Sequence, residues 1–263
     1  MNLLRRSIAP VPDAAWETLE SDARDALKEQ LVARRIVDFD GPYGIGRAAV
    51  NLGSLAPVDL GPGVSAGLRE VQPLFEVRVP FVVSRRAVDD AARGAPDFDT
   101  TAAVEAARRL AEIEDRAVLH GLPPAGIRGL AESSPHPALS LGEDPLGFAD
   151  VITRGLMALD DAGVAGPYAL VLGSTPYRRL AAGSGAYPPL KHLTTLVSGK
   201  VLRSRTLDGG LLVSLRGGDF RLTVGQDAAI GYRRDDAERI ELFFVESFTF
   251  LVLSPEAAVR FNA

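Results

Sequence analysis

A glycine pattern near the start of the chain could hold the pyrophosphate of a dinucleotide. Gly44, Gly46 and Ala49 spell G-x-G-x-x-A, the pattern that opens a dinucleotide-binding βαβ unit. Such a site needs a helix directly after the glycines, because the pyrophosphate sits on the N-terminus of that helix. The segment RAAVNL separates Gly46 from Gly53, which allows roughly two helical turns at most. We therefore predict that these glycines form a turn leading into a loop, and we expect no cofactor here.

A second motif could carry nucleophilic catalysis. GVSAG at residues 63–67 matches the G-x-S-x-G nucleophile elbow, with Ser65 in the position of the nucleophile. That elbow lies between a strand and a helix. The preceding residues DLGP do not form a strand pattern. A serine hydrolase centred on Ser65 is therefore an alternative hypothesis, and a Ser65→Ala variant that kept all activity would exclude it.

The histidines are too scattered to predict a metal site. His120, His136 and His192 lie in three different neighbourhoods, and the sequence contains no H-E-x-x-H. His120 follows EDRAVL, at the end of a predicted helix, where it is expected to act as a C-terminal cap. We predict no metal and no catalytic histidine.

The densest acidic cluster within a predicted helix is Glu112, Glu114 and Asp115. Adjacent helical residues point about 100° apart, so Glu114 and Asp115 do not make an acid/base dyad by themselves. We expect a solvated helix surface whose lysine or arginine partners come from elsewhere. The sequence thus predicts no catalytic residues.

Composition excludes several further classes. The 263 residues are 46% hydrophobic and 24% charged, as in ordinary globular proteins. A net charge of −5 gives no general attraction to nucleic acid or to anionic lipid. Cysteine is absent, which excludes disulfides and zinc–thiolate sites. No apolar run could span a membrane, and the N-terminus lacks the apolar core of a signal peptide, so we expect a cytoplasmic protein.

The periodicities predict an α+β arrangement. Helical spacing marks residues 14–35, with Asp13 as cap, and residues 100–120 and 146–162. PLFEVRVPFVVS, at residues 73–84, alternates with a period of two and predicts a long strand. The C-terminal third is rich in strand patterns. This order of elements does not follow regular βαβ alternation.

Two features indicate self-association. Residues 50–72 are rich in glycine and show no sustained period, which predicts a long irregular loop of the kind shaped by a partner. The final predicted strand carries Phe243, Phe244, Phe248 and Phe250. Extended elements of this kind are typical of proteins that bury surface against copies of themselves.

Several segments together resemble the encapsulins, the shell proteins of bacterial and archaeal nanocompartments once catalogued as linocin-type bacteriocins. The resemblance runs from Met1 to about Ala258. In chain order it is carried by RSIAPVPDAAWETLESDAR, ARRIVDFDGPYG, AEIEDRAVLHG, GVAGPYALVLG, RGGDFRLTVGQDAAIGY and ESFTFLVLSPEA.

The resemblance implies the fold of tailed-bacteriophage major capsid proteins. It places the N-terminal helix and the start of a peripheral domain at residues 1–48 and an extended loop at 49–72. The peripheral domain continues over 73–131, an axial domain covers 132–223, and the closing strands of the peripheral domain lie at 224–263. GPYGIG would then be the turn that launches the extended loop toward a neighbouring subunit.

The resemblance also implies a function. Encapsulins close into icosahedral shells, most simply of 60 copies, around a cargo protein such as a dye-decolorising peroxidase or a ferritin-like protein. The cargo docks on the inner wall through a short C-terminal peptide. The positions that match the family's docking site are Leu31, Arg34, Val37, Asp38, Asp227 and Ile230. The alternative is that these residues merely join a helix to a sheet.

A pore and the absence of a cofactor follow from the same resemblance. GSGAYPP matches the segment that lines the fivefold pore, which makes Ser184, Gly185, Ala186 and Tyr187 the predicted pore-lining residues. Some relatives carry a histidine where this chain has Ala186. Some also bind flavin through a tryptophan after the long strand, whereas this chain reads SRRAVDD there, so no flavin is expected.

A prophage capsid protein is a further alternative. It would share the fold but package DNA, and it usually carries an N-terminal scaffolding segment. The first predicted helix begins near residue 14, which we expect to leave no room for such a segment.

Overall fold

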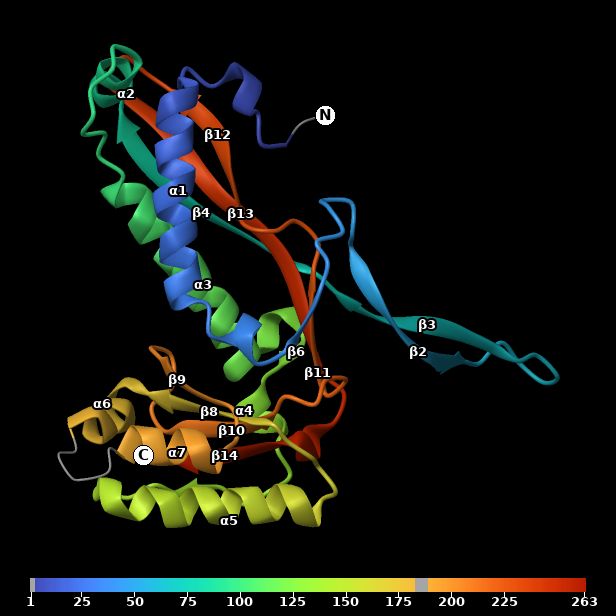
Figure 1. Cartoon of the computed structure of the whole chain (residues 1–263). Coiled ribbons are helices and arrows are strands. Elements are labelled where there is room, and N and C mark those ends of the chain that lie inside the picture. The colour runs from blue at the N-terminus through green and yellow to red at the C-terminus, as the bar shows by residue number, and fades with distance from the viewer. Residues whose placement is uncertain (1–2, 183–188) are drawn as a thin grey trace.

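The described part of the chain forms two five-stranded β-sheets, one projecting β-hairpin and one short two-stranded pair (Figure 1). The computed structural model describes residues 3–182 and 189–263. The first sheet comprises β1 (Asp38–Asp40), β4 (Phe75–Ser84), β11 (Phe220–Val224), β12 (Ala229–Asp235) and β13 (Arg239–Val252). The second comprises β7 (Leu139–Ser140), β8 (Tyr168–Gly173), β9 (Lys200–Ser204), β10 (Gly210–Ser214) and β14 (Ala258–Asn262). The predicted α+β class is confirmed.

The long strand β13 is the spine of the first sheet. β4 pairs antiparallel with it from Arg239 to Phe248. β12 and then β11 pair with successive stretches of it, and the break between them falls at residues 225–228. The alternation predicted for β4 is confirmed, because every second residue of that strand is buried. The aromatic rings interlock across the pair, with Phe81 5.4 Å from Phe244 between ring centroids.

Two long helices cover one face of the first sheet, α1 (Asp13–Gln30) and α3 (Thr101–Leu119) (Figure 1). α1 ends earlier than predicted: after Gln30 the chain turns through η2 (Ala33–Arg35). The predicted cap at Asp13 is also wrong, since Pro12 occupies the cap position and Asp13 is already the first residue of the helix. The helical spacing nevertheless predicts the buried stripe of α1, including Trp16 and Leu19.

The second sheet is packed against α5 (Phe148–Asp161), α6 (Ser174–Ala182) and α7 (Pro189–Leu196). Its strand β8 is buried almost throughout. Gly155 of α5 lets the helix approach the sheet closely, because a Cβ there would lie 2.9 Å from the ring of Phe261.

The projecting arm is a hairpin of β2 (Ala49–Val58) and β3 (Ala66–Pro73) (Figure 1). The prediction of an irregular loop over residues 50–72 is therefore wrong. A period of two appears in a sequence when a strand buries one face, and most residues of the arm are exposed on both faces in the single subunit. The glycines of the GPYGIG segment form the turn before the arm, as predicted, and no helix follows them.

The remaining elements are short. They are η1 (Arg6–Ile8), α2 (Arg85–Ala92), β5 (Gly121–Leu122), η3 (Pro123–Ala125), β6 (Ile127–Arg128), α4 (Leu130–Ser133), η4 (Pro145–Gly147) and η5 (Pro255–Ala257). Among the described residues, no helix is both long enough and apolar enough to cross a membrane.

Two strands belong to a different sheet than the predicted domain boundaries imply. β11, which begins within residues 132–223, pairs with β13 in the first sheet. β14, within residues 224–263, pairs with β10 and β7 in the second. The chain thus crosses from the second sheet to the first between β10 and β11, and back again between β13 and β14. The domain boundaries themselves stay a prediction.

Candidate functional site

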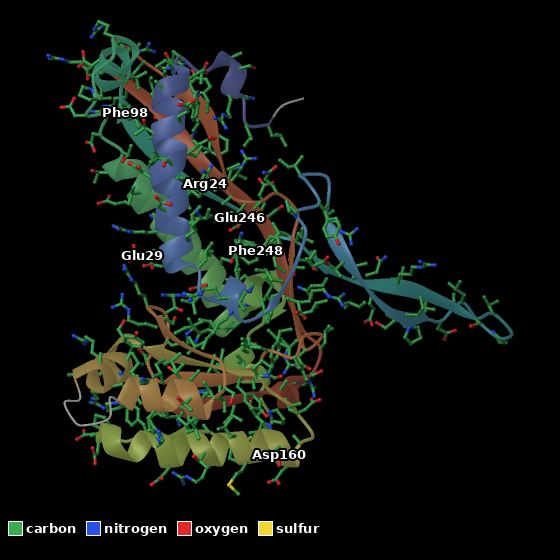
Figure 2. The ribbon with its side chains drawn as sticks, viewed as in Figure 1. Arg24, Glu29, Phe98, Asp160, Glu246 and Phe248 are labelled. Carbon is green, nitrogen blue, oxygen red and sulfur yellow. The ribbon has the colours of Figure 1, made fainter. Side chains whose placement is uncertain are left out.

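A groove of about 480 Å³ lies between α1 and the β12 edge of the first sheet. Figure 2 labels Arg24 on its helical side and Glu246 on the strand behind it. Its lining residues are Glu20, Ala23, Arg24, Leu27, Lys28, Leu31, Arg34, Arg35, Asp227, Ala228, Ile230 and Phe244. The groove combines an apolar wall with charged groups at its rim.

The helical wall follows from four-residue spacing along α1. Ala23, Leu27 and Leu31 form one stripe, and Glu20, Arg24 and Lys28 form a second stripe beside it. Residues four apart lie above one another on a helix, so each stripe presents one kind of surface. The apolar stripe is buried or half-buried, whereas Arg24 and Lys28 are exposed.

At the end of the groove, Arg34 joins three carboxylates from different parts of the chain. Its Nε lies 2.9 Å from Oε1 of Glu114, and its Nη2 lies 2.6 Å from Oε2 of the same residue. Nη2 also donates to Glu246, and Nη1 lies 2.9 Å from Oδ1 of Asp227. Glu114 and Glu246 are almost fully buried, while Asp227 is 41% exposed at the groove. One guanidinium thus links α3 and β13 to the groove wall.

The cluster shifts the acidity of its members. Burial, together with the neighbouring Glu114, raises the pKa of Glu246 well above its ordinary value. Burial lowers the pKa of Arg34, but the hydrogen bond and charge of Glu114 and the charges of Glu246 and Asp227 outweigh it and raise the pKa. Arg34 therefore stays charged, and burial beside Glu114 makes the ionised form of Glu246 less favourable than it would be in water.

Asp115 fixes the chain between α1 and Arg34. Its carboxylate accepts hydrogen bonds from the N–H groups of Val32, at 3.1 Å, and Ala33, at 2.8 Å. Burial raises the pKa of Asp115 to about 7, against the opposing effect of these two N–H groups. The solvated surface predicted for the acidic cluster is wrong for Glu114 and Asp115, which are buried, and right for the exposed Glu112. The predicted arginine partner of this helix is Arg34.

Four of the six predicted docking residues line this groove, and two do not. Leu31, Arg34, Asp227 and Ile230 are brought together here. Val37 and Asp38 instead line a separate hollow of about 210 Å³ beside Lys200, where Asp38 accepts a hydrogen bond from the N–H of Gly218 at 2.6 Å. The sequence interpretation missed the charged stripe of α1 and Phe244. The four-residue spacing of that stripe was a signal that could have found it.

The other candidates make no catalytic constellation. Ser65 lies beside the tip of the arm, directly before β3, and no helix follows it. His120 is at the C-terminal cap position of α3, but its Nε2 lies 2.7 Å from the carbonyl of Thr206 rather than bonding its own helix. In the part of the chain that the structure describes, no group of three His, Asp or Glu residues could hold a metal ion. The predicted pore residues Ser184, Gly185, Ala186 and Tyr187 lie outside the described residues.

Comparison with known proteins decides the family. The sequence profile described as "Encapsulating protein for peroxidase" matches residues 1–249. The "Type 1 encapsulin shell protein" of Rhodospirillum rubrum is 45% identical, over 98% of this chain and 96% of that protein. The chain belongs to the encapsulin shell proteins. As an encapsulin it is a shell protein and not an enzyme.

Solved structures confirm the capsid-type fold of this encapsulin. The virus-like particle from Pyrococcus furiosus superposes with a TM-score of 0.69 at 17% identity, over 93% of this chain and 98% of that one. The capsid of an empty GTA particle gives a TM-score of 0.58 at 15% identity, over 88% and 89% of the two chains. At these identities the similarity concerns the fold alone.

Proposed function

We propose that this encapsulin assembles with copies of itself into a closed icosahedral shell, most simply of 60 subunits, that encloses a cargo protein. The cargo's C-terminal peptide would lie in the groove beside α1. The observation that carries the docking proposal is the groove itself, with its apolar stripe of Ala23, Leu27 and Leu31 next to the paired Arg34 and Asp227. Aliphatic side chains fit the stripe, and the fixed charges at the end set the direction of the peptide.

The arm supports the assembly proposal. Six of its large apolar side chains are 44–68% exposed in the single subunit: Leu52, Leu55, Leu60, Val64, Leu68 and Val71. A two-stranded hairpin is marginally stable on its own, and an apolar surface of this kind marks an interaction site. A neighbouring subunit that covers the arm would supply both the missing core and the main-chain partners for its edges.

The remaining parts of the proposal rest on family resemblance. Val37 and Asp38 would take part in docking from the adjacent hollow, and the segment containing Ser184 and Tyr187 would line a pore that admits small molecules. The division into peripheral and axial domains would follow the boundaries predicted above. The shell would reside in the cytoplasm, without a cofactor, nucleic acid or membrane partner.

The cargo class remains part of the proposal as well. The family profile carries the description "Encapsulating protein for peroxidase", which favours a dye-decolorising peroxidase over a ferritin-like protein. A neighbouring reading frame that ends in a short apolar-basic tail would identify it.

The test of docking uses two matched aspartate substitutions on α1. Leu27→Asp places a charge on the apolar wall, whereas Ala14→Asp places the same charge on an exposed position of the same helix outside the groove. Each variant is co-expressed with the cargo, particles are isolated, and the cargo mass per particle is measured. We expect empty particles from Leu27→Asp and full ones from Ala14→Asp. Intact Leu27→Asp particles with unchanged cargo would contradict the docking proposal, and a purified wild-type protein of one or two chains would contradict the shell.

A further inference from the structure

The main chain of β12 borders the groove as an open sheet edge. In the first sheet, the strand order ends at β12, which pairs with β13 on its other side. Ile230, near the start of this strand, and Ala228, just before it, line the groove. An edge strand presents N–H and C=O groups that can pair with an added strand.

One hydrogen bond shows which residues of β12 direct their main chain outward. The N–H of Tyr232 donates to the carbonyl of Leu4, at 2.7 Å, and therefore points away from β13. Successive residues of an antiparallel strand alternate in direction. The pairing with β13 is regular from Ala229 to Tyr232, and its irregularity comes later, between Tyr232 and Arg234. Ile230 therefore directs its N–H and C=O outward too, into the groove.

The chain's own N-terminal segment occupies this edge at one point and then leaves it. After Leu4 the chain turns into η1, where the guanidinium of Arg6 lies over the ring of Trp16 and pairs with Glu20 on α1. Leu4 thus shows that a main-chain carbonyl from outside the sheet can accept a hydrogen bond from this edge. Over residues 3–182 and 189–263, no other strand pairs with β12 beyond β13, so the edge at Ile230 is left for another partner.

Resting on the docking function proposed above, we propose that the cargo peptide binds as an added strand along the edge of β12. Its main chain would hydrogen-bond to the N–H and C=O of Ile230. Every second side chain would then point to the face of the sheet that α1 covers, where Leu27, Leu31 and Phe244 form the apolar wall. The partner is therefore an extended peptide with aliphatic residues at alternate positions, a recognition mode in which main-chain bonds give affinity and side-chain pockets give specificity.

Alternation of the main-chain bonds provides the test. A fluorescent reporter ending in four Ser-Leu repeats is co-expressed with the wild-type shell, and reporter fluorescence per purified particle is measured. Each residue of the tail is then replaced in turn by proline, which removes one N–H, and by alanine, which keeps it. At each position, the reporter fluorescence per particle of the proline variant is compared with that of the alanine variant. We expect proline to lower it by a further factor of about three to ten at positions that bond to Ile230, and to have little further effect at the positions between them. Amide hydrogen exchange of residues 229–231 should slow in loaded particles.

The outcomes separate this inference from the docking function. Suppose that Leu27→Asp abolishes loading, but the effect of proline does not alternate along the tail and amide exchange at Ile230 is unchanged. This result would overturn strand addition while leaving the docking proposal in place. A wild-type shell that loads no tailed reporter would contradict the docking proposal and strand addition together.

Discussion

Arg34 donates two parallel hydrogen bonds to Glu114, which lies 80 residues away in the sequence. They run from Nε to Oε1, at 2.9 Å, and from Nη2 to Oε2, at 2.6 Å. The same guanidinium reaches Glu246 and Asp227. A planar fork of this kind suits carboxylates in a way that a lysine ammonium does not. Arg34 thus holds α3, β13 and the groove wall together. Under the docking proposal, its role toward the peptide would be to fix Asp227.

Removal of Arg34 should destabilise the subunit. Arg34→Ala leaves Glu114 and Glu246 buried without a counter-charge, and breaking a buried ion pair in this way costs about 3–5 kcal/mol. We expect a clear fall in the midpoint of thermal unfolding for Arg34→Ala. The midpoint of Arg34→Lys should lie between those of Arg34→Ala and the wild type. Arg24→Ala is the matched control, because Arg24 lines the same groove but is exposed. Equal midpoints for Arg34→Ala and Arg24→Ala would refute the clamp role.

Asp115 should make stability depend on pH between about 4 and 7. Burial raises its pKa from 3.8 to about 7, so its protonated form is favoured in the folded state. Its contribution to stability is full below about pH 4 and is lost as the pH rises through 7. The free energy of unfolding lost over this range is about 4 kcal/mol. Across this range, the midpoint temperature of thermal unfolding should therefore fall less steeply with rising pH in Asp115→Asn than in the wild type. Glu112→Gln, on the exposed side of α3, should keep the wild-type slope; an unchanged slope in Asp115→Asn would argue against this assignment.

The sequence predicted best those elements that bury one face. β4 alternates, and α1 and α3 repeat their apolar residues every three or four positions, because each packs against the same core. The arm could not be predicted as strands, since neither face of β2 or β3 is buried within the subunit. The end of α1 was missed for a different reason. It depends on Asp115, which lies 83 residues away from Val32 in the sequence.

The residues of the proposed docking groove were predicted only where the resemblance supplied them. Asp227 and Ile230 meet Leu31 and Arg34 because the break between β11 and β12 turns residues 225–228 toward α1. No periodicity encodes that meeting. The burial of Glu114 was equally invisible, because a buried carboxylate and a solvated one look alike until the arginine that neutralises it has been placed.

A charge on the arm should block assembly without unfolding the subunit. Leu68 is 68% exposed and lies in β3 opposite Ala56. Leu68→Asp therefore removes no packing within the subunit, but it would bury a charge against a neighbour, which is strongly unfavourable. We expect subunits instead of particles in light scattering, with an unchanged far-ultraviolet circular dichroism spectrum. Arg69→Gln, the adjacent polar change, should still assemble. Full-sized particles from Leu68→Asp would show that this face of the arm is not an interface.

The turn that launches the arm should tolerate alanine at one glycine and not at another. Gly41 has a φ of +133°, and a Cβ there would lie 2.4 Å from the carbonyl oxygen of Val224. That oxygen accepts the N–H of Tyr43 at 3.0 Å, which fastens the root of the arm to β11. Alanine at position 41 would be strained in its backbone and would push this contact apart.

Gly46 provides the matched control, because a Cβ there would meet nothing within 4 Å. We expect Gly41→Ala to lower the thermal midpoint and reduce the yield of particles, because the arm would leave the sheet at a different angle. Gly46→Ala should assemble like the wild type. If both variants yield normal particles, the direction of the arm does not depend on the contact between Gly41 and Val224. If both fail, flexibility of the whole GPYGIG turn, rather than that one contact, is what assembly requires.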